Sequence, residues 1–348
     1  EAEKYFYKAL KLNSKLPGAH LGLGMIFQNK GRIKDAKTSY QYALRFDPQL
    51  MEANCNLGNI LREEGEIYLA VKHLSAAVKS NSGNAEVLGN LAVALLEIGE
   101  LDKALHYFQR SIEINKKIPD IRRNYAMALL KAGQFKQGFK EYKWRWLTPQ
   151  FSSIRRRWSV NQWDGGNVHR KKILIHTEQG FGDAIQFSRY VPLLIELGAD
   201  ICIECPSPLI RLFGTLHGVK KVSVNREAME PYDLHVPMLN LPLHFGTTLE
   251  TIPNTVPYLS VPNEKEITPN FSSEAAKILT VGIIWRGNPA HKNDSLRSPG
   301  LKVLRPLFET TNTKFFALEK NYAEEEIKSA HLENKVVNLG NQFKDFFD

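Results

Sequence analysis

The sequence has few cysteines and no long apolar run. The longest apolar candidate, residues 190–197, is broken by Pro192 and Glu196, whereas a helix that crosses a bilayer needs about 20 mostly apolar residues. The chain has only three cysteines, and an odd number argues against a disulfide framework and favours a reducing compartment. We therefore predict a soluble, cytoplasmic protein without a membrane span.

The sequence also lacks clustered metal ligands. It has no D-x-D pair and no grouped histidine, cysteine and aspartate set. Cys202 and Cys205 form a C-x-x-C, but they lie in an expected strand, where residues three apart point to opposite faces. We therefore predict that both cysteines pack in the core and that the protein holds no metal.

Length and charge give broader limits. The 348 residues favour two or three domains, and 43% hydrophobic and 24% charged residues are typical of packed globular proteins. The net charge of +9 favours anionic partners in general. Basic residues gather at 155–157 and 169–172, where a solvated linker is a better explanation than a nucleic-acid site.

The first half contains an internal repeat. Glycines recur at one constant spacing at Gly31, Gly65, Gly99 and Gly133. Small residues follow five positions later, at Ala36, Ala70, Ala104 and Gly138, and large ones fill a fixed position at Tyr40, Leu74, Phe108 and Tyr142. Small residues let two antiparallel helices approach closely, and a glycine turn joins them. The pattern therefore predicts an α-solenoid of helix pairs.

This pattern resembles the tetratricopeptide repeat. Full repeats are predicted to start near Pro17, Met51, Ala85 and Pro119. Ala2, Phe6 and Ala9 match the second helix of an earlier, partial repeat. We assign residues 1–150 to the repeat array.

Three asparagines occupy one repeat position. Asn56, Asn90 and Asn124 recur at the same interval as the glycines, and Gly22 stands at this position in the first repeat. The resemblance to O-linked N-acetylglucosamine transferases, which hold a peptide backbone on a similar asparagine ladder, implies a protein or peptide acceptor on the concave face. The alternative is that asparagine is simply common at this position.

The junction between the halves is basic and aromatic. Trp144, Trp146, Trp158 and Trp163 lie in or beside residues 151–170. Large rings bury much apolar area, so we expect them to dock the two halves together. Stacking on a sugar or base is the alternative.

The second half alternates strands and helices. We expect a strand at 173–176, a glycine loop at 179–183, a helix from Ala184, strands at 200–204 and 221–224, and a helix at 208–216. This order predicts a mostly parallel, Rossmann-like sheet over residues 171–265. A second such domain over 278–348 would contain a strand at 279–285, a helix between Pro306 and Asn312, and a strand at 314–318.

The glycine loop has two interpretations. Gly180 and Gly182 at a strand-to-helix turn suit an anionic ligand. Glu204 lies where a dinucleotide enzyme places its ribose-binding acid, so an NAD-dependent oxidoreductase is one hypothesis. Ile185 stands where the third glycine of that motif belongs, which weakens it.

Residues 176–190 resemble the corresponding loop of bacterial repeat-containing proteins whose catalytic part is similar to the heptosyltransferases. The resemblance implies a GT-B glycosyltransferase: two Rossmann-like domains, here with the last one truncated, that use no metal or cofactor. It implies that Asp183 deprotonates an acceptor hydroxyl. We expect a helix start to keep this carboxylate ionised.

The same resemblance implies that a loop over residues 286–298 contacts the nucleotide-sugar diphosphate, together with Gly180 and Gly182. Lys292 and Arg297 would supply charge, and Asn288, His291 and Ser298 would supply hydrogen bonds. A solvated polar loop is the alternative.

Two main hypotheses follow. In the first, a metal-independent glycosyltransferase transfers a sugar from a nucleotide sugar to an acceptor, such as a protein or peptide, presented by the repeats. In the second, the chain is a non-catalytic adaptor that mediates protein–protein interaction through its repeats.

Overall fold

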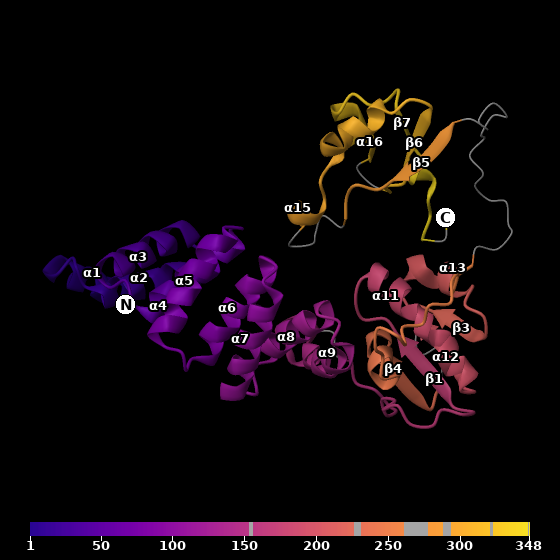
Figure 1. The fold of residues 1–348 in the computed structure, drawn as a ribbon, viewed down its shortest axis with the longest axis horizontal. Coiled ribbons are helices and arrows are strands. Elements are labelled where there is room, and N and C mark those ends of the chain that lie inside the picture. The colour runs from indigo at the N-terminus through magenta and orange to yellow at the C-terminus, as the bar shows by residue number, and fades with distance from the viewer. Residues whose placement is uncertain (153–155, 226–230, 261–277, 288–293, 321–322, 347) are drawn as a thin grey trace. The chain divides into compact units, whose positions relative to one another are not determined.

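The chain divides into two units, whose helices and strands are labelled in Figure 1. The structure is a computed structural model that describes residues 1–152, 156–225, 231–260, 278–287, 294–320, 323–346 and 348. The first unit combines Glu1–Ser159 with Asn240–Pro253, and the second combines Val160–Leu239 with Asn254–Asp348.

The first unit is an array of paired helices. After α1 (Ala2–Leu12), the first helices of the pairs are α2 (Pro17–Asn29), α4 (Met51–Glu63), α6 (Ala85–Glu97) and α8 (Pro119–Lys131). The second helices are α3 (Ile33–Phe46), α5 (Ile67–Ser80), α7 (Leu101–Ile114) and α9 (Phe135–Tyr142). We call these two sets the A helices and the B helices. None of the helices in the described ranges is both long and apolar enough to span a bilayer.

The repeat boundaries predicted from the sequence are confirmed. The four A helices begin at the four predicted starts, and the turn glycines Gly31, Gly65, Gly99 and Gly133 adopt φ between 72° and 85°. Other residues rarely adopt this left-handed conformation, which ends the A helix. The partial repeat is also present, because the ring of Phe6 in α1 fills the space beside Gly22.

Close approach of the A and B helices forms the core of the array. A methyl group built on Gly24 would lie 2.4 Å from Tyr40 Cε1, and one on Gly58 would lie 2.7 Å from Leu74 Cγ. Tyr40 and Leu74 are fully buried. The small residue on one helix and the large one on the other therefore interlock, as the sequence pattern predicts.

A returning segment closes the end of the array. Helix α14 (Leu241–His244) belongs to the first unit and packs against α9. Arg145, in the 3₁₀ helix η1 (Lys143–Leu147), is only 1% exposed and donates from Nη2 to Asn240 Oδ1 at 2.7 Å. Its guanidinium lies 4.8 Å from the Tyr142 ring centroid and 4.7 Å from that of Trp146.

This closure differs from the organisation expected from the sequence. Residues 240–253 group with the repeats, whereas the sequence pattern favours a single domain over 171–265. Trp146 packs within the first unit and Trp163, whose Nε1 donates to Gly166 O, packs within the second. The predicted domain limits and the docking of the halves through these rings stay predictions.

The second unit contains a parallel sheet of four strands. Its order is β3-β2-β1-β4, with β1 (Lys172–His176), β2 (Asp200–Glu204), β3 (Val219–Ser223) and β4 (Leu234–Pro237). The connecting segments form α11 (Phe181–Phe187), η2 (Ser188–Tyr190), α12 (Val191–Glu196), η3 (Ser207–Leu209) and α13 (Ile210–Phe213). The central residues of β1 are fully buried, which is typical of a parallel strand covered on both faces. The predicted helix at 208–216 is shorter than expected.

The same unit contains a second parallel sheet. Its order is β5-β6-β7, with β5 (Leu279–Ile283), β6 (Thr313–Ala317) and β7 (Val336–Asn338). Around it lie α15 (Asp294–Arg297), the 3₁₀ helix η7 (Leu301–Glu309), α16 (Ala323–Ser329) and η8 (Gly340–Gln342). The predicted helix between Pro306 and Asn312 is wrong: η7 contains Pro306 and ends at Glu309. Parallel sheets in this region are confirmed.

Two substitutions in α2 test the interlocking of the helices. We expect Gly24→Ala to destabilise the repeats, because the new methyl group meets the rigid Tyr40 ring at 2.4 Å, and overpacking costs about 1–3 kcal/mol. Gly18→Ala is the matched control, since nothing lies within 4 Å of its added methyl group. Urea unfolding followed by circular dichroism measures both. Equal stability of the two variants would contradict the packing.

Candidate functional site

The predicted asparagine row lies on one face of the A helices. In each A helix, positions separated by four, three and four residues share a face. In α4, α6 and α8 these positions are Glu52, Asn56, Asn59 and Glu63; Glu86, Asn90, Val93 and Glu97; and Asp120, Asn124, Met127 and Lys131. We call this set the A-helix face. Helices α4 and α6 are direct neighbours, as are α6 and α8, so the face continues from one repeat to the next.

The three asparagines are half-buried and oriented by neighbours. Asn90 Nδ2 donates to Cys55 Sγ at 3.5 Å, and Asn124 Oδ1 accepts from Arg123 Nη2 at 3.4 Å. Burial raises the pKa of Tyr40 to about 12, although a hydrogen bond with Asn56 acts in the opposite direction. The three amide groups therefore lie at equivalent positions on successive A helices, and each forms a hydrogen bond with a different kind of side chain.

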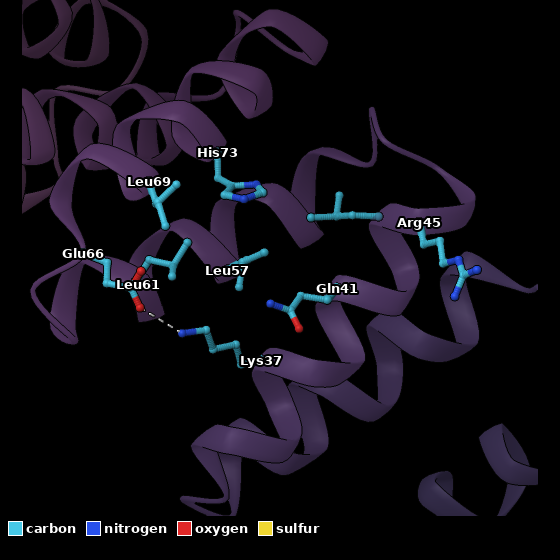
Figure 2. A pocket seen from close by; sticks show the side chains of 9 residues that line it. Lys37, Gln41, Arg45, Leu57, Leu61, Glu66, Leu69 and His73 are labelled. Carbon is cyan, nitrogen blue, oxygen red and sulfur yellow. Dashed lines mark hydrogen bonds and ion pairs between the residues drawn. The ribbon is translucent and has the colours of Figure 1, made fainter.

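A hollow lies between two B helices (Figure 2). It has a volume of 460 Å³ and is lined by residues of α3, α4 and α5 together with Glu66. Its apolar lining is Leu44, Leu57, Leu61 and Leu69. Lys37 on its rim forms ion pairs with Glu64 and, at 3.4 Å, with Glu66. The sequence analysis missed this hollow, because its residues come from three helices and share no repeat position.

The glycine loop of the second unit follows β1. Gly180 is the N-cap of α11, and Asp183, in the first turn, accepts a hydrogen bond from the Gly180 backbone. This is half of a capping box, in which the third helical residue binds back to the N-cap N–H. A methyl group on Gly182 would meet nothing within 4 Å, so packing does not require glycine there.

Burial, more than the helix start, sets the direction of the pKa shift of Asp183. The helix begins at Phe181 rather than near Ala184 and has seven residues. Burial raises the pKa of Asp183, and the hydrogen bond from Gly180 opposes this only in part. Desolvation therefore outweighs the helix start, and the carboxylate is a stronger base than an unperturbed aspartate.

Buried polar groups accompany this loop. His176, at the end of β1, lies with its Nε2 3.3 Å from Nδ1 of His235 in β4, and both rings are buried. The sequence analysis did not select His235, because β4 was not predicted.

Cys202 and Cys205 are buried as expected, and burial raises the pKa of Cys205 to about 12. Among the described residues, no three histidine, cysteine or acidic side chains group as metal ligands.

The predicted diphosphate loop is described only in part. Asn288, His291 and Lys292 lie outside the described residues. Ser298 Oγ accepts from Gly287 N at 2.9 Å and donates to Asp294 Oδ1 at 2.6 Å. Arg297 is exposed in α15. Ser298 therefore closes its own loop, while Arg297 faces solvent.

The comparisons with known proteins concern the repeats. The tetratricopeptide repeat family matches residues 21–148. Solved structures similar to the chain include MamA, with 22% identity, a TM-score of 0.38, and coverage of 44% of this chain and 90% of that one. YrrB, described as a tetratricopeptide-repeat protein with an unusual peptide-binding site, has 19% identity, a TM-score of 0.38, and coverage of 42% and 75%.

A third similar structure is PilF of Pseudomonas aeruginosa, with 24% identity, a TM-score of 0.37, and coverage of 44% of this chain and 67% of that one. A search of curated proteins finds no match. Residues 21–148 thus consist of tetratricopeptide repeats, a class whose arrays support protein–protein interaction.

Two effects of the Asp183 side chain on stability, its hydrogen bond to Gly180 and its partly buried charge, are separable by substitution. Asp183→Ala removes the acceptor for the Gly180 N–H, and loss of such a cap costs about 1 kcal/mol. In a unit of this size that lowers Tm by about 2–4 °C. Asp183→Asn keeps an acceptor oxygen and removes the partly buried charge, so we expect a Tm equal to or above that of the wild type at pH 7.

The stability difference between Asp183→Asn and the wild type should depend on pH. A raised pKa means that ionised Asp183 disfavours the folded state above that pKa, whereas below the ordinary carboxyl pKa of about 3.9 no penalty exists. Any advantage of Asp183→Asn should therefore be greatest at neutral pH and vanish toward pH 4. An advantage that grows as the pH falls would show that the pKa of Asp183 is lowered instead.

Proposed function

We propose that the protein is a scaffold whose A-helix face holds an extended polypeptide. The observation that carries this proposal is the row formed by Asn56, Asn90 and Asn124, half-buried at equivalent positions on three neighbouring A helices. A carboxamide offers both donors and an acceptor, which match the N–H and C=O groups of a peptide backbone. A backbone bound in this way need not have one particular sequence.

The spacing of the row suits an extended chain. Packed helices lie about 8–10 Å apart, and an extended chain advances about 3.3 Å per residue. Successive asparagines would therefore meet every third residue of the bound segment. Residues 21–148 belong to a repeat class known for holding protein partners, which supports the same function.

Substitution of the central asparagine tests this function. A peptide selected from a displayed library of random dodecapeptides is labelled, and its Kd is measured by fluorescence anisotropy. We expect Asn90→Ala to raise Kd about threefold to tenfold, the loss of one or two net hydrogen bonds. Gln109→Ala, an exposed site on the B helix α7, is the control and should leave Kd unchanged. Unchanged binding after joint replacement of all three asparagines would contradict the proposal.

A second candidate is that the second unit is a metal-independent, cofactor-independent glycosyltransferase of GT-B type. The observation that favours it is Asp183, a half-buried carboxyl of raised pKa in the loop after a central parallel strand. General bases work best when their pKa is raised toward the operating pH. The resemblance of residues 176–190 to heptosyltransferase-like proteins, and the presence of a second parallel sheet, support the same candidate.

In this candidate, Asp183 takes the proton of an acceptor hydroxyl, which attacks the anomeric carbon of a nucleotide sugar. The diphosphate leaves with the bonding electrons, and Arg297 and Lys292 stabilise its charge. The acceptor would be the segment held by the repeats.

Ligand-induced stabilisation distinguishes the candidates for the second unit. We expect one nucleoside diphosphate or nucleotide sugar to raise the Tm of the whole chain, and Arg297→Gln to weaken this shift, because a charge-assisted hydrogen bond is lost. Stabilisation by NAD alone would favour an oxidoreductase. No shift with any nucleotide would leave the chain as a scaffold without transferase activity.

A further inference from the structure

We propose that the A-helix face selects an extended segment that carries lysine or arginine at about every third residue. This inference rests on the proposed scaffold function and adds the chemistry of the partner. Its basis is the set of acidic side chains that border the asparagine row on both sides.

The acidic side chains occupy the two ends of the face. Five of its twelve positions are acidic and one is basic: the acids are Glu52, Glu63, Glu86, Glu97 and Asp120, and the base is Lys131. All five acids are exposed. Other positive side chains nearby are Arg62 of α4 and Arg123 of α8.

Helix stability explains only some of these acids. Glu52, Glu86 and Asp120 lie in the first turns of their helices, where a negative charge is favourable. Glu63 and Glu97 are the last residues of α4 and α6, where the helix dipole disfavours a negative charge. Its ion pair with Arg62 accounts for Glu97, whereas a bound cation would account for Glu63.

Most of these acids have no internal counterion. Arg62 Nη1 pairs with Glu97 Oε1 at 2.9 Å. In the described part of the chain, Glu52, Glu63, Glu86 and Asp120 form no ion pair. Arg62 thus neutralises one acid of the five, and four remain available to a partner.

An electrostatic interaction places two of the acids beside the row. Burial raises the pKa of Cys55, the hydrogen bond from Asn90 lowers it, and the carboxylates of Glu86 and Glu52 raise it further. Both acids therefore lie near the thiol that Asn90 contacts.

The local charge opposes the charge of the whole protein. The chain carries a net charge of +9, so a basic ligand is repelled at long range. Exposed charges further apart than about 8 Å are largely screened at physiological ionic strength. A preference for a basic segment would therefore arise from the A-helix face itself. Non-specific attraction by the net positive charge of the chain would favour an acidic segment instead.

Three synthetic dodecapeptides test the inference on the whole chain. One peptide has lysine at every third position, the second has glutamate there and the third has asparagine. Glycine and serine fill the other positions, and each peptide carries one fluorophore. We expect the lysine peptide to bind most tightly by anisotropy. Glu52→Gln with Glu86→Gln should raise its Kd about fivefold and reduce the salt dependence, because two exposed ion pairs are lost.

The matched control replaces two exposed acids on the B helix α7, Asp102→Asn with Glu113→Gln, and should leave Kd unchanged. Equal binding of the peptides, or tighter binding of the glutamate peptide, overturns the inference and leaves the scaffold function intact. The inference is also overturned if the control pair of substitutions weakens binding of the lysine peptide as much as the Glu52 and Glu86 pair does. No binding by any of the three contradicts both proposals.

Discussion

The close approach of each A helix to its B helix is the constraint on which the repeat unit depends. Gly24 against Tyr40 and Gly58 against Leu74 leave no room for a side chain in the first two repeats, and the buried Ala92 and Ala126 hold the same position in the next two. This contact fixes the rotation of each A helix about its own axis. Because the rotation is the same in successive repeats, side chains at one repeat position form a row, and the asparagine row is a consequence of core packing.

The second unit positions its polar groups by a different rule. Parallel strands buried on both faces carry their polar residues in the loops that follow them. Asp183 follows β1 in this way, and its hydrogen bond to Gly180 closes the first turn of α11. This contact caps the helix whether or not Asp183 also acts as a general base.

The repeats could be predicted from the sequence almost to the residue. The constant spacing from Gly31 to Gly133 is a local property of the chain, and each glycine marks a turn that other residue types resist. The strands β1 and β2 were predicted for a similar reason, since a continuous apolar run between polar segments is typical of a buried parallel strand.

Other features depend on contacts that the sequence does not display. Strand β4 has four residues and ends in Pro237, and β7 has three, so neither gives a pattern. The hydrogen bond from Arg145 to Asn240 joins residues 95 apart in the chain, and it returns residues 240–253 to the repeat unit. The raised pKa of Asp183 was not predicted, because burial cannot be inferred from its place at a helix start.

The central claim is that the A-helix face of the repeats holds the partner. The most direct measurement places the photoreactive residue p-benzoylphenylalanine at Val93, on that face, or at Tyr68, which is 78% exposed on the B helix α5. After irradiation with a bound dodecapeptide, mass spectrometry identifies the adducts. The account predicts peptide adducts from position 93 and none from position 68, and the reverse result would contradict it.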